Sequence, residues 1–333
     1  MVLSHYEIGA IESITEFERG SRRSPKVVVV SADGKFLLKR RAARRKSERK
    51  VAFSHRVQER LAAVAFPLPR LIRARNDGPT AVSVRDETYE LFEFIDGEAF
   101  PVTPAAACDA GRTLARFHQA VLAIDIPDSV PSGTYHDTIG VRTGLNVIPR
   151  SISSHDSVVG QEIDLQSVTE VLFDDYDRAA SAVERISAAD SLAVQILHAD
   201  WHAGNMLFRD DKVLAVMDYD SCRVAERITD VANGALHFSL ISGGHPDRWP
   251  DHPDRKRLVA FMRGYQEASP LAAAERQALT HLMIEALIAE SVLPIVHAGS
   301  FEQWASFGFL RMVARKVKWF RENEEEILEA TRS

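Results

Sequence analysis

The chain has 333 residues, of which 45% are hydrophobic and 26% are charged, and its formal net charge is −6. This is the composition of a globular protein that is large enough to bury a sizeable core. The acidic balance argues against a nucleic-acid partner, whose binding surface would be basic, and is compatible with a cationic substrate. Cys108 and Cys222 are too few for a disulfide framework or a four-thiolate zinc site.

The same features bear on where the protein works. The N-terminal residues show no basic region followed by an apolar stretch, and no apolar run approaches the ~20 residues that cross a bilayer. A chain with two cysteines suits a reducing compartment. We therefore expect a cytoplasmic protein without a membrane partner, whereas its oligomeric state stays open.

The first 95 residues are predicted to form a β-rich lobe with one helix. Lys26–Ser31 (KVVVVS) and Lys35–Lys39 (KFLLK) are separated by a turn signal, which predicts a hairpin. Phe53–Ala65 has apolar residues at helical spacing, and two prolines after it end the helix. Val82–Val84 and Tyr89–Ile95 supply two further strands, the second of which ends at an Asp-Gly turn signal.

From about residue 104 the pattern changes to helices. Pro104–Leu122 is a long amphipathic segment, and residues 165–187 are also predicted to be helical. Residues 128–160 are polar, with scattered Gly, Ser and Pro, and predict a long irregular connection.

The middle of the second lobe is predicted to be extended. Leu192–Leu197 reads as a buried strand, and Met206–Phe208 and Val213–Met217 read as two short strands joined by a turn. Helical pattern returns from Ile228 onward. The sequence thus predicts an α+β fold with two lobes, a β-rich lobe at residues 1–95 and a larger, mostly helical lobe at residues 96–333.

Residues 198–205 read HADWHAGN and carry the strongest chemical signal. Two histidines four apart could form a zinc site on a helix, but the HExxH motif needs Glu where Ala199 stands, and Gly204 and Asn205 favour a loop. The spacing His-x-Asp-x-x-x-x-Asn is that of the kinase catalytic loop, in which the Asp accepts a hydroxyl proton and the Asn binds Mg²⁺. A polar turn without catalytic function is the simpler alternative.

Two further residues complete this interpretation. Phosphoryl transfer needs a second metal carboxylate, and Asp218 stands at the end of an apolar strand that would hold it rigidly. It also needs a phosphate-binding lysine in the first lobe, and Lys39 ends the strand KFLLK. The pattern predicts Asp200 as the catalytic base, Asn205 and Asp218 as Mg²⁺ ligands, and Lys39 as the phosphate contact.

These stretches, with FPLPRL, YELFEFIDGEAF and AGRTLARFH, resemble motifs of the aminoglycoside phosphotransferase and choline kinase family, which has the protein-kinase-like fold. The resemblance covers nearly the whole chain, and the C-terminal half is similar to the branch that contains homoserine kinases. It implies ATP and Mg²⁺ as cofactors and Asp230 as an aspartate that supports the catalytic loop. It also implies that the first lobe binds the nucleotide, with contacts from Gly20, Ser21, Lys39, Glu93, Phe94 and Ile95.

The chain departs from the family pattern at three places. Ala199 replaces the usual glycine before the catalytic aspartate, and the nucleotide loop has only Gly20. Ser54 and His55 stand where the family usually has a glutamate that pairs with the lysine, and Glu59 follows about one turn later. Either Glu59 pairs with the lysine or a different pairing is used.

Two other features have alternative interpretations. Residues 39–50 hold eight basic residues and one Glu, which predicts either a solvated loop and helix start or a patch for nucleic acid or an anionic surface. Glu285 and Glu290 lie in an otherwise apolar helix, where a carboxylate needs a partner, either an internal one or an ammonium group of the substrate.

The sequence therefore predicts an ATP- and Mg²⁺-dependent phosphotransferase that acts on a hydroxyl of a small polar metabolite. Amino alcohols, hydroxy amino acids, aminoglycosides and sugars are the acceptors implied by the resemblance. The alternatives are a kinase of a protein or glycan, and a nucleotide-binding pseudokinase that serves as an interaction module. The identity of the acceptor and the choice between ATP and GTP stay open.

Overall fold

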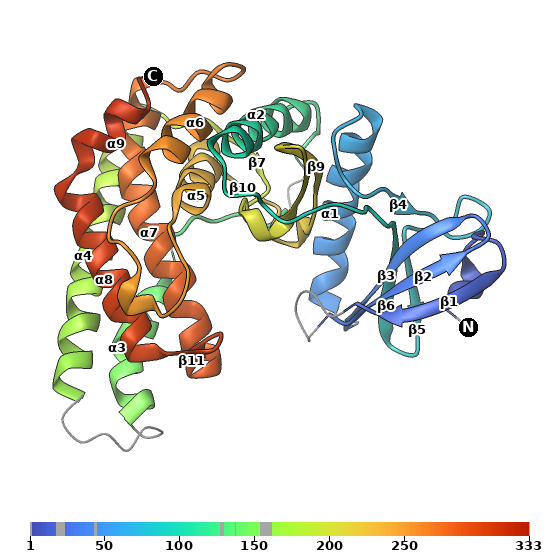
Figure 1. Cartoon of the computed structure of the whole chain (residues 1–333), viewed down its shortest axis with the longest axis horizontal. Coiled ribbons are helices and arrows are strands. Elements are labelled where there is room, and N and C mark those ends of the chain that lie inside the picture. Colours follow the sequence, from blue (N-terminus) through green and yellow to red (C-terminus); the bar gives the residue numbers. More distant parts are fainter. Residues whose placement is uncertain are drawn as a thin grey trace.

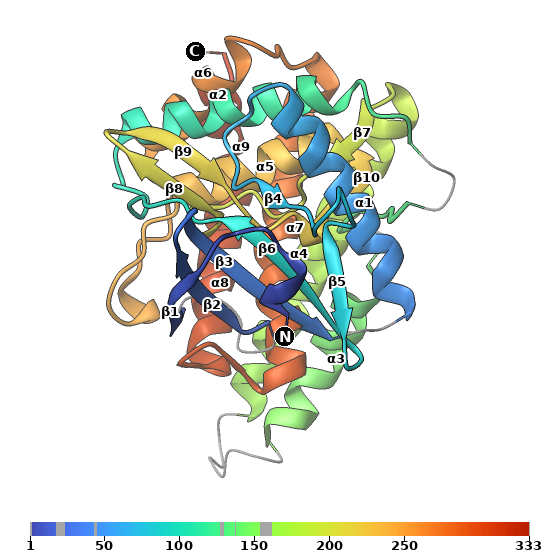
Figure 2. The same ribbon diagram turned by 90° about the vertical axis from the view of Figure 1, so that its right-hand side faces the viewer.

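The computed structural model describes residues 2–17, 24–42, 45–126, 130–136, 138–153 and 162–332. They form a smaller lobe built on a β-sheet and a larger lobe of helices, connected by the segment between β6 (Glu87–Glu93) and α2 (Pro104–Val121) (Figure 1). From the side of the smaller lobe, its sheet lies in front of the larger lobe (Figure 2). The predicted α+β fold class is confirmed, whereas Gly20 and Ser21 lie outside the described residues.

Besides β6, the smaller lobe comprises η1 (Leu3–His5), β1 (Ile11–Glu16), β2 (Lys26–Ser31), β3 (Gly34–Ala42), α1 (Arg45–Ala63), β4 (Leu71–Ile72) and β5 (Ala81–Val84). Its sheet is antiparallel, with strand order β1-β2-β3-β6-β4 and β5 paired to β6. The register places Lys39 of β3 directly opposite Glu90 of β6, so both side chains lie on the same face of the sheet.

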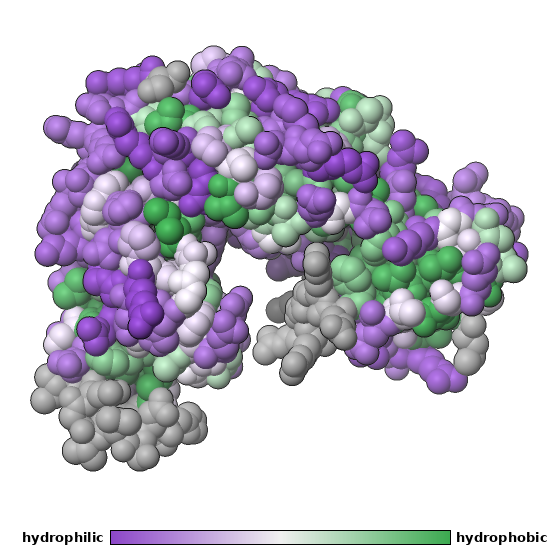
Figure 3. Space-filling model, in the orientation of Figure 1, coloured by the Kyte–Doolittle hydropathy of each residue, from purple (hydrophilic) through white to green (hydrophobic). Residues whose placement is uncertain are grey.

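The larger lobe is helical, with short strands that carry the predicted catalytic residues. Its helices after α2 are α3 (Ile139–Ser153), α4 (Glu162–Ala189), α5 (Arg227–Ser239), α6 (Arg255–Gln266), α7 (Ala273–Ala298), α8 (Ser306–Glu322) and α9 (Glu324–Ala330). The other elements are β7 (Val194–Leu197), η2 (Ala203–Asn205), β8 (Met206–Arg209), β9 (Lys212–Val216), η3 (Tyr219–Ser221), β10 (Arg223–Glu226), η4 (Pro246–Arg248), β11 (Ser300–Phe301) and β12 (Trp304–Ala305). The space-filling view shows an open cleft between the lobes (Figure 3).

Helix α7 is the central helix of the larger lobe. Within the described part of the chain, it is the one helix that is long and apolar enough, by length and composition, to cross a membrane. The sequence had predicted no apolar run of that length. Its apolar window is 72% buried inside the protein, and it packs against α3, α4, α5 and α8. The apolar side chains of α7 therefore form part of the core of the larger lobe.

The prediction of an irregular connection over residues 128–160 was wrong for residues 139–153, which form α3. Val141, Leu145, Ile148 and Ile152 repeat at helical spacing and are buried in the core. Glycines and a proline within this stretch reduce its helix propensity and mask the pattern. Burial against α4 and α7 outweighs that weak propensity.

Helices α2 and α6 approach each other closely at two glycines. A Cβ added at Gly111 would overlap the carbonyl oxygen of Phe261, and one added at Gly264 would overlap that of Cys108. At each glycine, the backbone of the partner helix thus occupies the position where another residue would have its Cβ. Since α2 also packs against α5 and β7, this contact fixes the position of the elements around the catalytic loop.

We expect Gly264→Ala to destabilise the protein by about 3 kcal/mol, because the added methyl group can be accommodated only if the α2 and α6 backbones separate. Gly308→Ala in α8 is the matched control, since nothing lies within 4 Å of its added Cβ. It should instead stabilise the protein by about 1 kcal/mol through helix propensity. Urea denaturation of both variants measures the difference, and equal stabilities would contradict the close-packed contact.

Candidate active site

The turn after β7 carries the HADWHAGN stretch and is held by a buried carboxylate. Asp230 of α5 accepts hydrogen bonds from the backbone amides of His198 and Ala199, both at 2.8 Å. Its side chain is fully buried, and His118 of α2 lies 3.3 Å from it. The backbone of Ala199 is left-handed, with φ of 61°. That conformation suits glycine, and Asp230 holds an alanine in it.

Asp200 projects from this turn and is paired on both carboxylate oxygens. Asn205 Nδ2 donates to Asp200 Oδ2 at 2.7 Å, and His202 Nε2 lies 3.3 Å from Asp200 Oδ1. His202 Nδ1 accepts from the Gly204 amide, so the ring presents its Nε2 proton to the carboxylate. Burial disfavours the charged form of Asp200, but His202 and Asn205 outweigh it and hold its pKa below the usual value.

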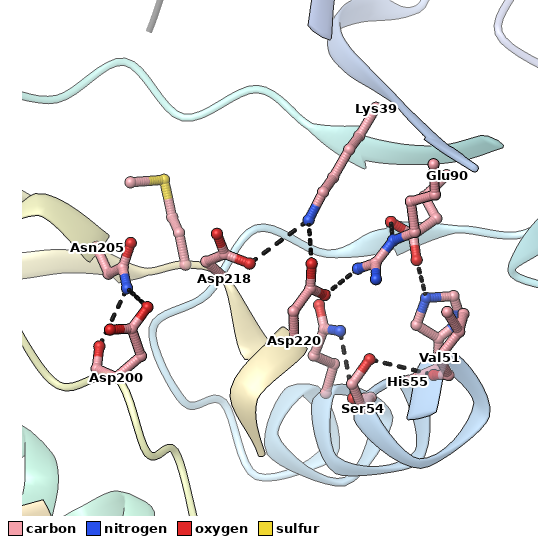
Figure 4. Close-up of polar contacts among 12 residues, drawn as sticks. Lys39, Val51, Ser54, His55, Glu90, Asp200, Asn205, Asp218 and Asp220 are labelled. Carbon is pink, nitrogen blue, oxygen red and sulfur yellow. Dashed lines mark hydrogen bonds and ion pairs between the residues drawn. The ribbon is translucent and has the colours of Figure 1, made fainter. Parts of the chain in front are cut away.

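Asp218 follows β9 after one residue, Met217, and lies beside Asn205 (Figure 4). Its backbone is left-handed, with φ of 60°, and the preceding Met217 amide donates to the carbonyl of Asn205 at 2.8 Å. The buried ring of His198 lies 3.1 Å from the Met217 carbonyl, so the two turns are joined by backbone and side-chain contacts. These contacts bring the residues predicted as metal ligands to neighbouring positions at the ends of one hairpin (Figure 4).

Cations from the smaller lobe meet these carboxylates. Lys39 Nζ lies 2.7 Å from Asp220 Oδ2 and 3.5 Å from Asp218 Oδ1, and Arg41 binds the second oxygen of Asp220 (Figure 4). Burial disfavours the charge of Asp220, but Lys39 and Arg41 outweigh it and lower its pKa. Burial, together with the charge of Lys39, also lowers the pKa of Lys26 on the neighbouring strand. The smaller lobe thus presents a cluster of basic groups at the junction.

The helix α1 takes part through His55 and not through a carboxylate. His55 Nε2 lies 2.6 Å from Glu90 Oε1, and Arg41 Nε donates to Glu90 Oε2 at 2.7 Å. Burial disfavours the charge of Glu90, but the hydrogen bond with His55 and the charge of Arg41 lower its pKa. Glu59, the sequence candidate for the lysine partner, instead pairs with Arg73 at the surface. Of the two possibilities that the sequence left open, the structure shows the different pairing, since Lys39 contacts Asp218 and Asp220.

The predicted hinge residues are Glu93, which ends β6, and the next two, Phe94 and Ile95. The amide of Glu93 donates to the carbonyl of Arg70 at 2.9 Å, and the amide of Phe94 donates to that of Lys35 at 3.0 Å. Further along, the backbone of Glu98 exchanges two hydrogen bonds with Phe208 of β8. The hinge is therefore tied to both lobes, and two of its amides are engaged within the protein.

A second polar cluster lies on the other side of Asp200. Glu290 of α7 lies 2.6 Å from His237 Nε2 and accepts hydrogen bonds from Tyr135 and Asn233. Burial disfavours its charge, but His237 and Tyr135 lower its pKa, so it is a carboxylate at neutral pH. The His237 ring lies 5.6 Å from that of His202. Glu290 thus has partners within the protein, which was one of the two interpretations of its position in an apolar helix.

Comparison with known proteins agrees with this geometry. The model of the family described as the phosphotransferase enzyme family (APH) matches residues 13–279, well over half of the chain. The chain belongs to the phosphotransferase enzyme family. No curated protein matches this phosphotransferase significantly.

Solved structures show the same protein-kinase-like fold. A microcompartment-associated aminopropanol kinase is 16% identical, with a TM-score of 0.70 over 99% of this chain and 98% of that chain. An aminoglycoside phosphotransferase from Alicyclobacillus acidocaldarius is 15% identical, with a TM-score of 0.66 over 98% and 95%. A choline kinase from Cryptosporidium parvum is 13% identical, with a TM-score of 0.61 over 98% and 91%.

The donor set of the phosphotransferase fits a magnesium ion shared with phosphate groups. Among the described residues there is no group of three or more His, Cys, Asp or Glu that could hold a metal by itself. Asn205 can offer Oδ1 because its Nδ2 is donated to Asp200, and Asp218 offers a carboxylate that is 42% exposed. Mg²⁺ is commonly bound by one or two protein oxygens together with substrate phosphates.

The structure brings together the predicted residues Lys39, Asp200, Asn205 and Asp218. Several participants were not found from the sequence, namely Arg41, Glu90, Tyr135, Asn233 and His237. His55 was noted only for its place in the helix, without a partner. A signal for two of them was present. Arg41 is two residues after Lys39 and so shares its face of the strand, and Glu90 is a charged residue within an apolar strand.

We expect Ala199→Gly to stabilise the phosphotransferase by about 1 kcal/mol, because glycine adopts a positive φ without the steric penalty of a Cβ. Ala225→Gly on the neighbouring strand β10, where φ is not positive, should instead destabilise it. Chemical denaturation measures both changes. A loss of stability in Ala199→Gly equal to that in Ala225→Gly would show that the turn does not strain the alanine.

Proposed function

We propose that the protein transfers the γ-phosphoryl group of Mg-ATP to a hydroxyl of a small polar metabolite. The observation that carries the proposal is the junction of the lobes, where Lys39 meets Asp218 and Asp220 within reach of the Asp200–Asn205 pair. Phosphoryl transfer requires one carboxylate for the attacking hydroxyl and a set of charges for the phosphates. The arrangement supplies both.

On the acceptor side, Asp200 acts as the base. Its lowered pKa keeps it ionised at neutral pH, so it can accept the hydrogen bond of the attacking hydroxyl and then its proton. His202 and Asn205 fix the orientation of the carboxylate through contacts to its two oxygens. The hydroxyl is thereby directed toward the phosphate before the reaction, which lowers the entropy cost of the transfer.

On the nucleotide side, Lys39 contacts the phosphates, and Asn205 Oδ1 and Asp218 hold Mg²⁺. The bound ion would neutralise charge that develops on the phosphate oxygens. Since Glu93 and Phe94 already use their amides, contacts to an adenine ring fall to Ile95 and to the carbonyls of the hinge. The lobe of residues 1–95 binds the nucleotide, with Gly20 and Ser21 in its phosphate loop, and residues 96–333 bind the acceptor.

We propose a cationic acceptor, such as an amino alcohol. Glu290 is 30% exposed and anionic, and it interacts electrostatically with Asp200. Asn233 Oδ1, next to it, is buried without a hydrogen-bond donor among the described residues. Two acceptors of this kind favour an ammonium group. The buried free thiols of Cys108 and Cys222 suit a cytoplasmic enzyme.

We expect Asp200→Asn to lower kcat by about 10²–10⁴-fold, because the general base is lost, and to leave Mg-ADP binding unchanged. ADP release is measured with Mg-ATP and a panel of homoserine, threonine, choline, ethanolamine, aminoglycosides and sugars. Asp218→Ala is the companion variant and should weaken Mg-ADP binding. If no acceptor stimulates ADP release although Mg-ATP raises the melting temperature, a protein or glycan substrate or a pseudokinase module replaces this proposal.

We expect Glu290→Gln to raise KM for a cationic acceptor by about tenfold or more, because a charged hydrogen bond is lost, with little effect on KM for ATP. Glu285→Gln is the matched control from the same helix. Burial raises the pKa of Glu285, which faces His136 at 3.4 Å, so its charge contributes less. Equal KM values for the two variants would contradict an ammonium site at Glu290.

A further inference from the structure

We propose that Arg41 and Glu90 are positioning residues for nucleotide binding: Glu90 fixes Arg41, and Arg41 holds Asp220 when Lys39 turns from the carboxylates to the phosphates. The proposal rests on the proposed function, since it takes Lys39 as the phosphate contact. It explains how the enzyme works without the helix glutamate that the family usually pairs with its lysine.

The contacts form one continuous chain between α1 and the turn that carries Asp218. His55 Nδ1 lies 2.6 Å from Thr80 Oγ1, and His55 Nε2 lies 2.6 Å from Glu90 Oε1. The second oxygen of Glu90 accepts from Arg41 Nε at 2.7 Å, and another nitrogen of the guanidinium binds Asp220. Asp220 in turn binds Lys39, so each of the four inner members of the chain has a partner on both sides, namely His55, Glu90, Arg41 and Asp220 (Figure 4).

The strand register explains how Glu90 of β6 meets Arg41 of β3. Lys39 and Arg41 lie on the same face of β3, and Glu90 of β6 lies directly opposite Lys39 on that face. From there the carboxylate reaches diagonally to Arg41. Glu90 is fully buried, and a buried carboxylate is stable only with charged or hydrogen-bonding partners. Its orientation is therefore fixed by Arg41 and His55.

The charges at the junction indicate that Arg41 compensates the negative charge of Asp220. In this structure, Lys39 and Arg41 face Asp218 and Asp220. When Asp218 binds the metal and Lys39 the phosphates, Asp220 loses the lysine and would stand uncompensated beside an anionic nucleotide. Arg41 remains bound to Asp220 and removes that repulsion. The guanidinium can do so because one planar fork serves Glu90 and Asp220 together, which a lysine ammonium does not reproduce.

The test compares Arg41→Gln and Arg41→Lys with Arg40→Gln. Arg40 is the adjacent strand residue, is 45% exposed and pairs with Glu87, so its variant removes the same charge outside the chain of contacts. Titration calorimetry with ADP and Mg²⁺ gives the affinity without turnover. We expect Arg41→Gln to weaken ADP binding by about tenfold or more, Arg41→Lys to restore little of it, and Arg40→Gln to bind like the wild type.

A second comparison separates positioning from a purely structural contribution. If the loss in Arg41→Gln comes from an uncompensated Asp220, then adding Asp220→Asn must recover part of the ADP affinity. KM for ATP should rise in Arg41→Gln while KM for the acceptor stays unchanged. ADP affinity equal to that of Arg40→Gln, full rescue by Arg41→Lys, or no recovery in the double variant would each overturn the proposal.

The outcome is distinguishable from failure of the proposed function. A wild-type protein that binds ADP with Mg²⁺ but transfers phosphate to no alcohol would refute the phosphotransferase reaction on small molecules. The affinities of the Arg41 variants would still decide the contribution of Arg41, because they are measured without turnover. A lower melting temperature with unchanged ADP affinity would mark Arg41 as structural only and overturn the inference.

Discussion

The two hydrogen bonds from the His198 and Ala199 amides to Asp230 are the interaction on which the rest of the site depends. They fix a backbone turn with a positive φ, and Asp200 follows it immediately. A buried amide that loses its acceptor costs about 1–3 kcal/mol, so the turn has no competing arrangement of similar energy. Because Asp230 lies on α5 and also contacts His118 of α2, the helical core and the catalytic loop are fixed together.

The two lobes contribute complementary charges to one junction. The smaller lobe supplies Lys39 and Arg41 from one face of β3, and the larger lobe supplies Asp218 and Asp220 from the turn after β9. Each set alone would repel itself, and neither would hold its orientation in water. The pairing across the junction therefore holds both sets in place. The phosphates of a nucleotide would take the place of the carboxylates as partners of these cations, which are already positioned.

The sequence allowed prediction of the parts of the site that are local in the chain. Asp200 and Asn205 lie five residues apart in one turn, and Asp218 follows the adjoining hairpin. Their spacing in the sequence was therefore enough to predict that they lie close together. The pairing of Glu90 with Arg41 and His55 joins three separate elements, and it depends on a strand register and a helix orientation that spacing does not encode. Helix α3 was missed for a related reason, because its stability comes from burial against α4 and α7.

The acceptor side poses a charge problem that the nucleotide side does not. Asp200 and Glu290 are both anionic and interact electrostatically, and the groups next to them are His202 and His237. Burial disfavours the charge of His237, but Glu290 raises its pKa, which favours the protonated ring, and the charge of that ring opposes the repulsion between the two carboxylates. Under our proposal, an acceptor with an ammonium group would add the remaining positive charge where Glu290 is exposed. Its hydroxyl would then meet the Asp200 carboxylate, whose ionised form the surrounding positive charges stabilise.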